Sequence, residues 1–230
     1  MDGLVPAKSG ANENTEETKG RIITILADCL FHETVPEGTE GSVVREYETS
    51  DGKKGEKNEL QYARVDNVLI TSVVFETGNY GENILITLSD GDNEVILAQA
   101  VDSPFGEDLL KKLPAIDFAE KLSLVPYKYQ NKKDKTRRGV DIYQKSDKVL
   151  NFFWDEATRT NLHGFPTLPE NTENYTNDMW KLHFLQARIV TVQYAKEHIV
   201  PKFVGREEKE EVKGFEYPES DLKPEDIPFD

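Results

Sequence analysis

Two long apolar stretches dominate the first third of the chain, at residues 21–31 and 62–75. Both are rich in isoleucine or valine, whose β-branched side chains favour extended backbone. We therefore predict a long strand in each stretch. Residues 50–59, which lie between them, contain two glycines and no apolar residue. That composition predicts an exposed loop.

Short apolar runs alternate with turn-forming residues in the next part of the chain. Gly with Asn or Asp clusters at residues 78–81 and again at 90–93. These turn signals separate the second long strand from apolar runs at 84–88 and 95–98. The pattern predicts a β-meander.

A short helix is predicted after the meander, at residues 104–113. Ser103 can cap its first turn, a proline suits its first position, and its lysines come late, where they favour the helix dipole. Apolar runs then resume and predict strands at residues 122–130, 140–145 and 149–154, around the polar segment 131–139.

The order of strands, one helix and further strands is typical of an OB-fold, a five-stranded Greek-key barrel with one inter-strand helix. An SH3-like barrel or a β-sandwich would give similar strand runs, but neither requires a helix at this place in the order. We therefore predict a mainly β protein whose OB-fold domain spans residues 21–155.

Three segments lie outside the predicted barrel. Residues 1–20 have the composition of a disordered N-terminal arm. Residues 156–204 comprise an irregular connector and a helix at 178–200. Residues 205–230 carry ten acidic side chains against four cations, which predicts a solvated acidic tail.

The predicted helix at 178–200 carries more apolar surface than one packing face requires. Asn177 can cap its start and a proline closes it. Six apolar residues at spacings near three and four form a stripe expected to face the core: Met179, Leu182, Leu185, Ile189, Val192 and Ile199. The surface is widened by Trp180, Phe184, Val190, Tyr194 and Val200. We expect the helix either to pack on its own barrel alone or to use a second side for self-association.

The whole chain is acidic, with 43 Asp and Glu against 28 Lys and Arg and a formal net charge of −15. This charge disfavours nonspecific attraction of the whole molecule to DNA or to anionic membranes. The single cysteine, Cys29, cannot form an intramolecular disulfide, which is typical of a reducing cytoplasm. No stretch approaches the roughly 18 apolar residues that span a bilayer, and the first twenty residues hold no apolar signal region. We expect a cytoplasmic protein with no membrane partner.

The sequence lacks the usual marks of enzymes and metal sites. It contains no glycine-rich phosphate-binding motif and no nucleophile elbow. Its four histidines fall at no metal-ligand spacing. Asp90, Asp92 and Glu94 alternate as calcium ligands can, but they lie at a predicted hairpin turn, where aspartate serves the backbone. We predict no enzymatic activity, no cofactor and no metal.

Residues 121–150 reverse the acidic character of the chain, because nine Lys and Arg against three Asp give a local net charge of +6. Tyr127 and Tyr129 place both rings on one face of a strand. Tyr143 lies on the next strand, and Phe152 and Trp154 are further aromatic candidates. Tyrosines on strands also pack in cores, and lysine-rich loops are usually only solvated turns.

Together, however, rings and cations suit single-stranded nucleic acid, since bases stack on the rings while cations hold the phosphates. The expected phosphate ligands are Lys128, Lys132, Lys133, Lys135, Arg137 and Arg138, with Lys53, Lys54 and Lys57 closing over the strand from the predicted loop.

Two short motifs resemble single-stranded-DNA-binding proteins. The run Asp226, Ile227, Pro228, Phe229 is similar to the acidic tip of the bacterial proteins, and residues 123–129 resemble a barrel strand of the short-tailed-phage replication type. The resemblance implies an OB-fold that coats single-stranded DNA and a tail that recruits replication or repair proteins. It also implies that the tail occupies the DNA groove when DNA is absent. The bacterial tails end on the phenylalanine, whereas Asp230 follows Phe229 here.

We therefore predict a phage-encoded protein of the host cytoplasm that binds and protects single-stranded DNA without strong sequence preference during replication, recombination or repair. The alternative is an acidic protein-interaction factor, such as a DNA mimic or a virion or assembly protein. In that alternative the acidic surface is the functional feature.

Overall fold

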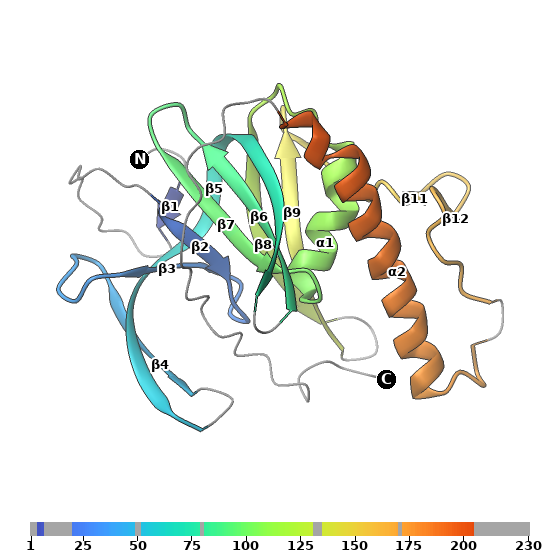
Figure 1. Cartoon of the computed structure of the whole chain (residues 1–230), viewed down its shortest axis with the longest axis horizontal. Helices are drawn as coiled ribbons and strands as arrows, with labels where there is room; N and C mark the ends of the chain where they lie inside the picture. The colour runs from blue at the N-terminus through green and yellow to red at the C-terminus, as the bar shows by residue number, and fades with distance from the viewer. Residues whose placement is uncertain are drawn as a thin grey trace.

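The computed structural model describes residues 20–48, 52–78, 81–130, 135–169 and 172–204, and the backbone of residues 4–6. This part of the chain is mainly β, with two α-helices (Figure 1). The strands are β1 (Leu4–Pro6), β2 (Ile22–Ile25), β3 (Phe31–Val35), β4 (Val43–Glu48), β5 (Lys54–Gly78), β6 (Gly81–Ser89), β7 (Glu94–Ala100), β8 (Leu122–Gln130), β9 (Thr136–Gln144), β10 (Asp147–Lys148), β11 (Trp154–Asp155) and β12 (Thr160–Asn161). The helices are α1 (Pro104–Lys112) and α2 (Asn177–His198), each followed by a 3-10 turn, η1 (Leu113–Ala115) and η2 (Val200–Lys202).

Five strands close a ring in the order β5, β3, β2, β7 and β6, and β6 pairs again with β5. The β2–β7 pair is parallel and the other pairs of the ring are antiparallel. Strand β8 lies outside the ring and pairs with the middle of β5, at Val65 and Val68. Strand β9 pairs with β8, and β10 pairs with β9. The predicted meander is therefore present as β5, β6 and β7.

Strand β5 is bent, and this lets its first part pair with β3 and its last part pair with β6. Its register shifts between Val65 and Val68 against β8 and again between Ile70 and Ser72 against β6. Asn67 has a φ of +57°, a left-handed conformation that asparagine tolerates better than most residues. These irregularities change which side chains face inward along the strand.

One continuous core joins the ring, α1 and the end of α2. Phe31, Leu97 and Leu110 are fully buried within it. Ile199 and Phe203 close the same core from the C-terminal side. The core therefore unites the predicted barrel with the helix that follows it.

Helix α1 is anchored at its start by Ser103. The Ser103 hydroxyl accepts a hydrogen bond from the Gly106 amide at 3.0 Å, which caps the first turn as predicted. It also accepts from the Gln99 side chain, whose carbonyl oxygen accepts the Ile25 amide. The helix cap is thus hydrogen-bonded to strands on both sides of the parallel pair.

The far end of α1 binds the free edge of β9. Asp108 accepts the Val140 amide at 2.8 Å, and the Lys112 ammonium donates to the Val140 carbonyl at 2.6 Å. Lys112 is buried and also pairs with Asp108 at 2.7 Å. Asp108 and Lys112 therefore form the hydrogen bonds to the Val140 backbone that a neighbouring strand would form in an extended sheet.

The prediction of one strand over residues 21–31 is wrong, because β2 ends at Ile25 and turns back into β3. The Leu26 amide donates to the Leu30 carbonyl across the turn, and Cys29 has a φ of +65°. The Asp28 carboxylate accepts the Leu30 amide, which stabilises the turn locally. Apolar residues on both sides of this turn concealed it in the sequence.

The prediction of a loop over residues 50–59 is also wrong for residues 54–59. They form the first part of β5 and pair with β4, a strand of alternating apolar and polar residues that was not among the predicted elements. This two-stranded ribbon projects from the body of the molecule (Figure 1). Most side chains of this ribbon are exposed or only partly buried, so its strands can form from mainly polar residues. The prediction of a strand at 149–154 is also wrong, because β10 ends at Lys148 and only Trp154 of that range lies in a strand, β11.

Helix α2 spans Asn177–His198 and is capped by Thr176 rather than Asn177. The prediction of its core-facing stripe is wrong for Met179, Leu182, Leu185 and Ile189, which are about half exposed. The buried positions of α2 are Ala187, Thr191 and Ala195, spaced four apart. Their small side chains let the helix backbone approach α1 and η1 closely. Neither described helix is long and apolar enough to cross a membrane.

Packing around Gly106 gives a test of the α1 docking. A Cβ atom at Gly106 would lie 2.0 Å from the Ala100 carbonyl oxygen, a backbone atom held by β7. We expect Gly106→Ala to lower the free energy of unfolding by about 2–3 kcal/mol, as overpacking does in cores. Urea denaturation followed by fluorescence measures this. Lys111→Ala on the same helix is the control, expected within about 0.5 kcal/mol of wild type. Equal midpoints for the Gly106 variant and the control would contradict the close approach.

Candidate nucleic-acid interface

The β8–β9 hairpin brings together most of the predicted DNA-binding residues that the structure describes. Its register places Tyr127 opposite Gly139 and Tyr129 opposite Arg137. Residues directly opposite in an antiparallel pair point to the same face, so both rings and the Arg137 side chain share one face of the hairpin. We call this the tyrosine face.

The ring of Tyr127 is fixed by its surroundings. A Cβ atom at Gly139 would lie 2.7 Å from the ring carbon Cζ, so the glycine makes room for the ring to cross its strand. The Tyr127 hydroxyl donates to Asp108 at 3.4 Å, and the Lys112 ammonium lies 5.6 Å from the ring centroid. Burial, together with Asp108 and Asp141, raises the pKa of Tyr127. The ring is half-buried and held against α1.

Tyr129 is the accessible member of the pair. Its side chain is 56% exposed, and its ring stacks on that of Tyr127 with centroids 6.0 Å apart and an interplanar angle of 23°. An anchored ring therefore supports an exposed one. Such a ring offers a flat apolar surface on which a base can stack.

The opposite face of the hairpin carries a pair of like charges. Lys128 lies directly opposite Arg138, an arrangement that is destabilising unless an anion compensates it. The Nε of Arg138 is buried and makes no hydrogen bond within the described residues. The Cys29 thiol lies near both cations, which oppose the rise that burial causes in its pKa. The β2–β3 turn therefore borders this pair.

The other predicted binding residues are hairpin cations, Tyr143 and the partner-binding residues of the tail. Lys135 and Arg137 lie at the described end of the hairpin, whereas Lys132 and Lys133 are outside the described residues. Tyr143 is on the tyrosine face, but its hydroxyl contacts Asp141 at 3.5 Å rather than the other two rings. The tail residues Asp226, Ile227, Pro228 and Phe229 also lie outside the described residues.

The lysines predicted to close over DNA from a loop occupy the β4–β5 ribbon instead. Lys54 is opposite Glu48 and Lys57 is opposite Arg45. The Lys57 ammonium lies over the Tyr47 ring, 4.6 Å from its centroid, and Lys53 directly precedes the strand. These side chains therefore belong to an ordered ribbon.

Phe152 and Trp154 lie in the connector that follows β10. Phe152 stacks on His163 with centroids 4.1 Å apart and also contacts Phe153 and Tyr194. This aromatic cluster joins the connector to α2. Trp154 pairs with Asn161 in the small β11–β12 sheet. Neither residue is on the hairpin.

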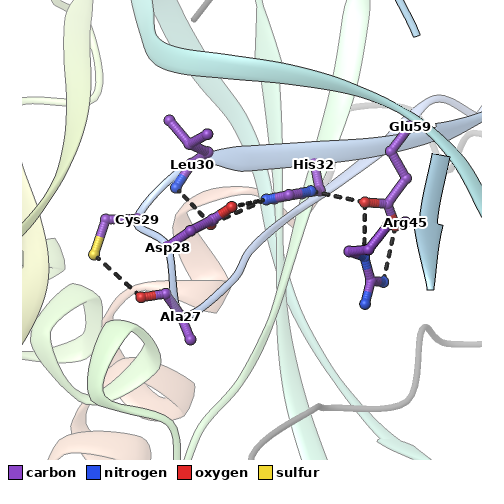
Figure 2. Close-up of polar contacts among 7 residues, drawn as sticks. All are labelled: Ala27, Asp28, Cys29, Leu30, His32, Arg45 and Glu59. Atoms are coloured by element: carbon purple, nitrogen blue, oxygen red, sulfur yellow. Dashed lines mark hydrogen bonds and ion pairs between the residues drawn. The ribbon is translucent and has the colours of Figure 1, made fainter. Parts of the chain in front are cut away.

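A row of charges, buried at His32 and Glu59 and reaching the surface at Asp28, links the strands near the β2–β3 turn (Figure 2). Arg45 donates two hydrogen bonds of 2.8 Å to Glu59, and Glu59 accepts from Nδ1 of His32 at 2.7 Å. Nε2 of His32 lies 2.9 Å from the Asp28 carboxylate at the other end. Two carboxylates and two cations alternate, so the row is neutral when His32 is protonated.

Contacts within the row favour the charged forms of both His32 and Glu59. Burial alone would lower the pKa of His32, but hydrogen bonds to Asp28 and Glu59 outweigh it and raise the pKa from 6.5 to about 9. Burial would raise the pKa of Glu59, but His32 and Arg45 lower it to about 2. The Cys29 thiol contacts the Ala27 carbonyl at 3.9 Å and points away from His32 (Figure 2). The row therefore ties β3, β4 and β5 to the turn.

No family model, curated protein or solved structure matches the chain. No group of His, Cys, Asp and Glu within the described residues is arranged to hold a metal ion. The case for a function therefore rests on the geometry of the hairpin.

Sequence reasoning missed the residues that position the tyrosine face. The sequence pattern indicates only that Asp108 and Lys112 lie on a helix and that Gly139 lies in a polar segment. A glycine inside a strand often marks a close approach, but that signal requires knowing that β9 begins at Thr136, before Gly139. The His32 row had no sequence signal, because its four members come from four separate elements.

The His32 row predicts a loss of stability in mild alkali. Because the folded pKa of His32 is raised, its contribution is complete below pH 6.5 and is lost as the pH rises through about 9. The free energy of unfolding should fall by up to about 3 kcal/mol over this range, from about 1.4 kcal/mol per pKa unit. Urea titrations at pH 6.5, 8 and 9.5 measure it.

His32→Gln should remove the pH dependence in this window, whereas His198→Gln, on the exposed end of α2, should retain it. A wild-type stability that stays flat between pH 6.5 and 9.5 would show that His32 is not held in its charged form.

Proposed function

We propose that this protein binds single-stranded DNA through the β8–β9 hairpin and does not act as an enzyme. The observation that carries the proposal is the tyrosine face, with an exposed ring stacked on an anchored ring among the cations of the hairpin tip. Stacking on aromatic rings accepts every base, so binding should show little sequence preference.

The strand connectivity supports an OB-fold as the framework for this function. A meander of β5, β6 and β7, then α1, then the β8–β9 hairpin returning to pair with β5, follows the order of OB-fold elements. The departure is the closure, because β2 and β3 complete the ring. The loop between β8 and β9 corresponds to one that OB-folds use at their binding surface.

The charges of the hairpin tip support binding of a phosphate backbone. Lys128, Lys135, Arg137 and Arg138 are its described cations, and two of them form the like-charged cross-strand pair. Phosphate anions would relieve the repulsion within that pair and give the Arg138 guanidinium a partner. A strand passing around the tip would set bases on the tyrosine face and phosphates against the cations, two of which, Lys128 and Arg138, lie on the opposite face.

We also propose, from the resemblance of its last residues, that the tail recruits replication or repair proteins and that the protein serves a phage in its host's cytoplasm. The tail's acidic and apolar residues suit docking on a basic groove with an apolar pocket. This role is separate from DNA binding by the hairpin.

Tyr129 offers the direct test of stacking. We expect Tyr129→Ala to weaken binding of oligo-dT about 5- to 150-fold, because one stacked base contributes roughly 1–3 kcal/mol. Tyr129→Phe keeps the ring and should bind within about twofold of wild type. Fluorescence anisotropy with labelled oligo-dT, beside a duplex of equal length, measures both variants. Failure of the wild type to bind oligo-dT would favour the acidic interaction factor.

The like-charged pair offers a test of phosphate contact. We expect Arg138→Gln to weaken binding of every single-stranded sequence alike and to lower the slope of log affinity against log salt by about one. Lys145→Gln is the control, because Lys145 is exposed and paired with Glu120 beyond the hairpin's far end. An unchanged slope for Arg138→Gln would remove this residue from the DNA contact.

A further inference from the structure

Residues 177–186 of α2 include large exposed apolar side chains and no buried residue. Of the helix, only Ala187, Thr191 and Ala195 are buried. Exposed fractions are 45% for Met179, 55% for Leu182, 48% for Leu185 and 50% for Ile189, and these four residues share one side of the helix. We call them the α2 patch. Phe184 is also exposed, but it lies on another side of the helix, where it stacks on Trp180. The lower part of the helix extends past the sheet in Figure 1.

This distribution is inverted relative to an ordinary surface helix, which turns its large apolar residues inward. Single exposed leucines are common on proteins, but a contiguous apolar group marks an interaction surface. Leu182, Leu185 and Ile189 follow one another at spacings of three and four, so they form a straight ridge along the helix. Such a ridge fits the groove of another helix.

We propose that the α2 patch pairs with the α2 patch of a second copy of this chain. The only other described α-helix, α1, is nine residues long and buries its own apolar face. The matching surface of equal length and spacing is therefore another α2. A self-complementary patch of this kind forms a two-fold symmetric contact.

Charge also favours a second copy at this place. The chain carries a formal net charge of −15, so two copies repel each other over most of their surfaces. Between residues 177 and 192, α2 carries only Asp178, Lys181 and Arg188 as charged residues, a net of +1. The patch is thus a place where two copies can approach without that repulsion.

The size of the patch predicts weak association. Four half-exposed side chains offer at most a few hundred Å² per copy, below the roughly 800 Å² per partner of a standard stable interface. Free copies should therefore pair only at high concentration. Neighbouring copies held on one DNA strand would pair more completely, because the strand raises their effective concentration. That consequence rests on the proposed function, whereas the contact itself does not.

Sedimentation velocity of the full chain over a concentration series, without DNA, tests the contact. We expect the average mass to rise from 26.2 kDa toward twice that value. Leu182→Asp should shift the transition to at least tenfold higher concentration. Leu150→Asp is the matched control, since Leu150 is the same residue type, 57% exposed, and lies off the patch. It should behave as wild type.

A second measurement uses a cysteine within the patch. Leu185→Cys should form a covalent dimer on mild oxidation, whereas Leu150→Cys should not, and the native Cys29 is buried. A single 26.2 kDa species at every concentration, without cross-linking at residue 185, would overturn the proposal and indicate that another occupant, such as the tail, covers the patch. Because no DNA is present, these outcomes are independent of whether the hairpin binds DNA.

Discussion

The bend in β5 is the constraint on which the closed sheet depends. A straight strand of 25 residues would extend about 80 Å at 3.3 Å per residue, several times the radius of a domain of this size. The left-handed conformation of Asn67 and the two register shifts bend the strand near its middle. The two ends of β5 can then pair with β3 and β6, and β8 attaches at the bend itself. The ring and the hairpin therefore share one structural origin.

The edge of β9 shows how the hairpin is held in place. One carboxylate, that of Asp108, accepts the Val140 amide, pairs with Lys112 and accepts the Tyr127 hydroxyl. Docking of α1 and orientation of the ring thus depend on the same group. A ring that is already oriented loses little conformational freedom when a base stacks on its neighbour. The exposed Tyr129 gains its orientation by stacking on the ring of Tyr127.

The sequence predicted the elements whose local signals agree with their tertiary surroundings. The meander, α1 with its serine cap and the strand at 122–130 all appear as predicted. The errors occur where tertiary contacts decide. Asp28 and the φ of Cys29 place a turn within a continuous apolar run, and cross-strand pairing with β4 makes a strand from polar residues. On α2 the small residues face inward, a choice that hydrophobic periodicity cannot detect. For the candidate site, strand alternation correctly placed Tyr127 and Tyr129 on one face, whereas the anchoring by Asp108 required the fold.

The net negative charge of the chain and the cations of the hairpin would affect a nucleic acid at different distances. At physiological ionic strength the screening length is about 8 Å, so charges spread over the rest of the surface act only weakly at the hairpin tip. Cations in contact with a phosphate are screened far less, and they set the affinity of the contact. The net charge of −15 instead slows approach to polyanions in general and keeps copies of the chain apart. Under the proposed function, a local cationic hairpin on an acidic protein would favour binding where stacking adds to the phosphate contacts, as it does for an unpaired strand and not for a duplex.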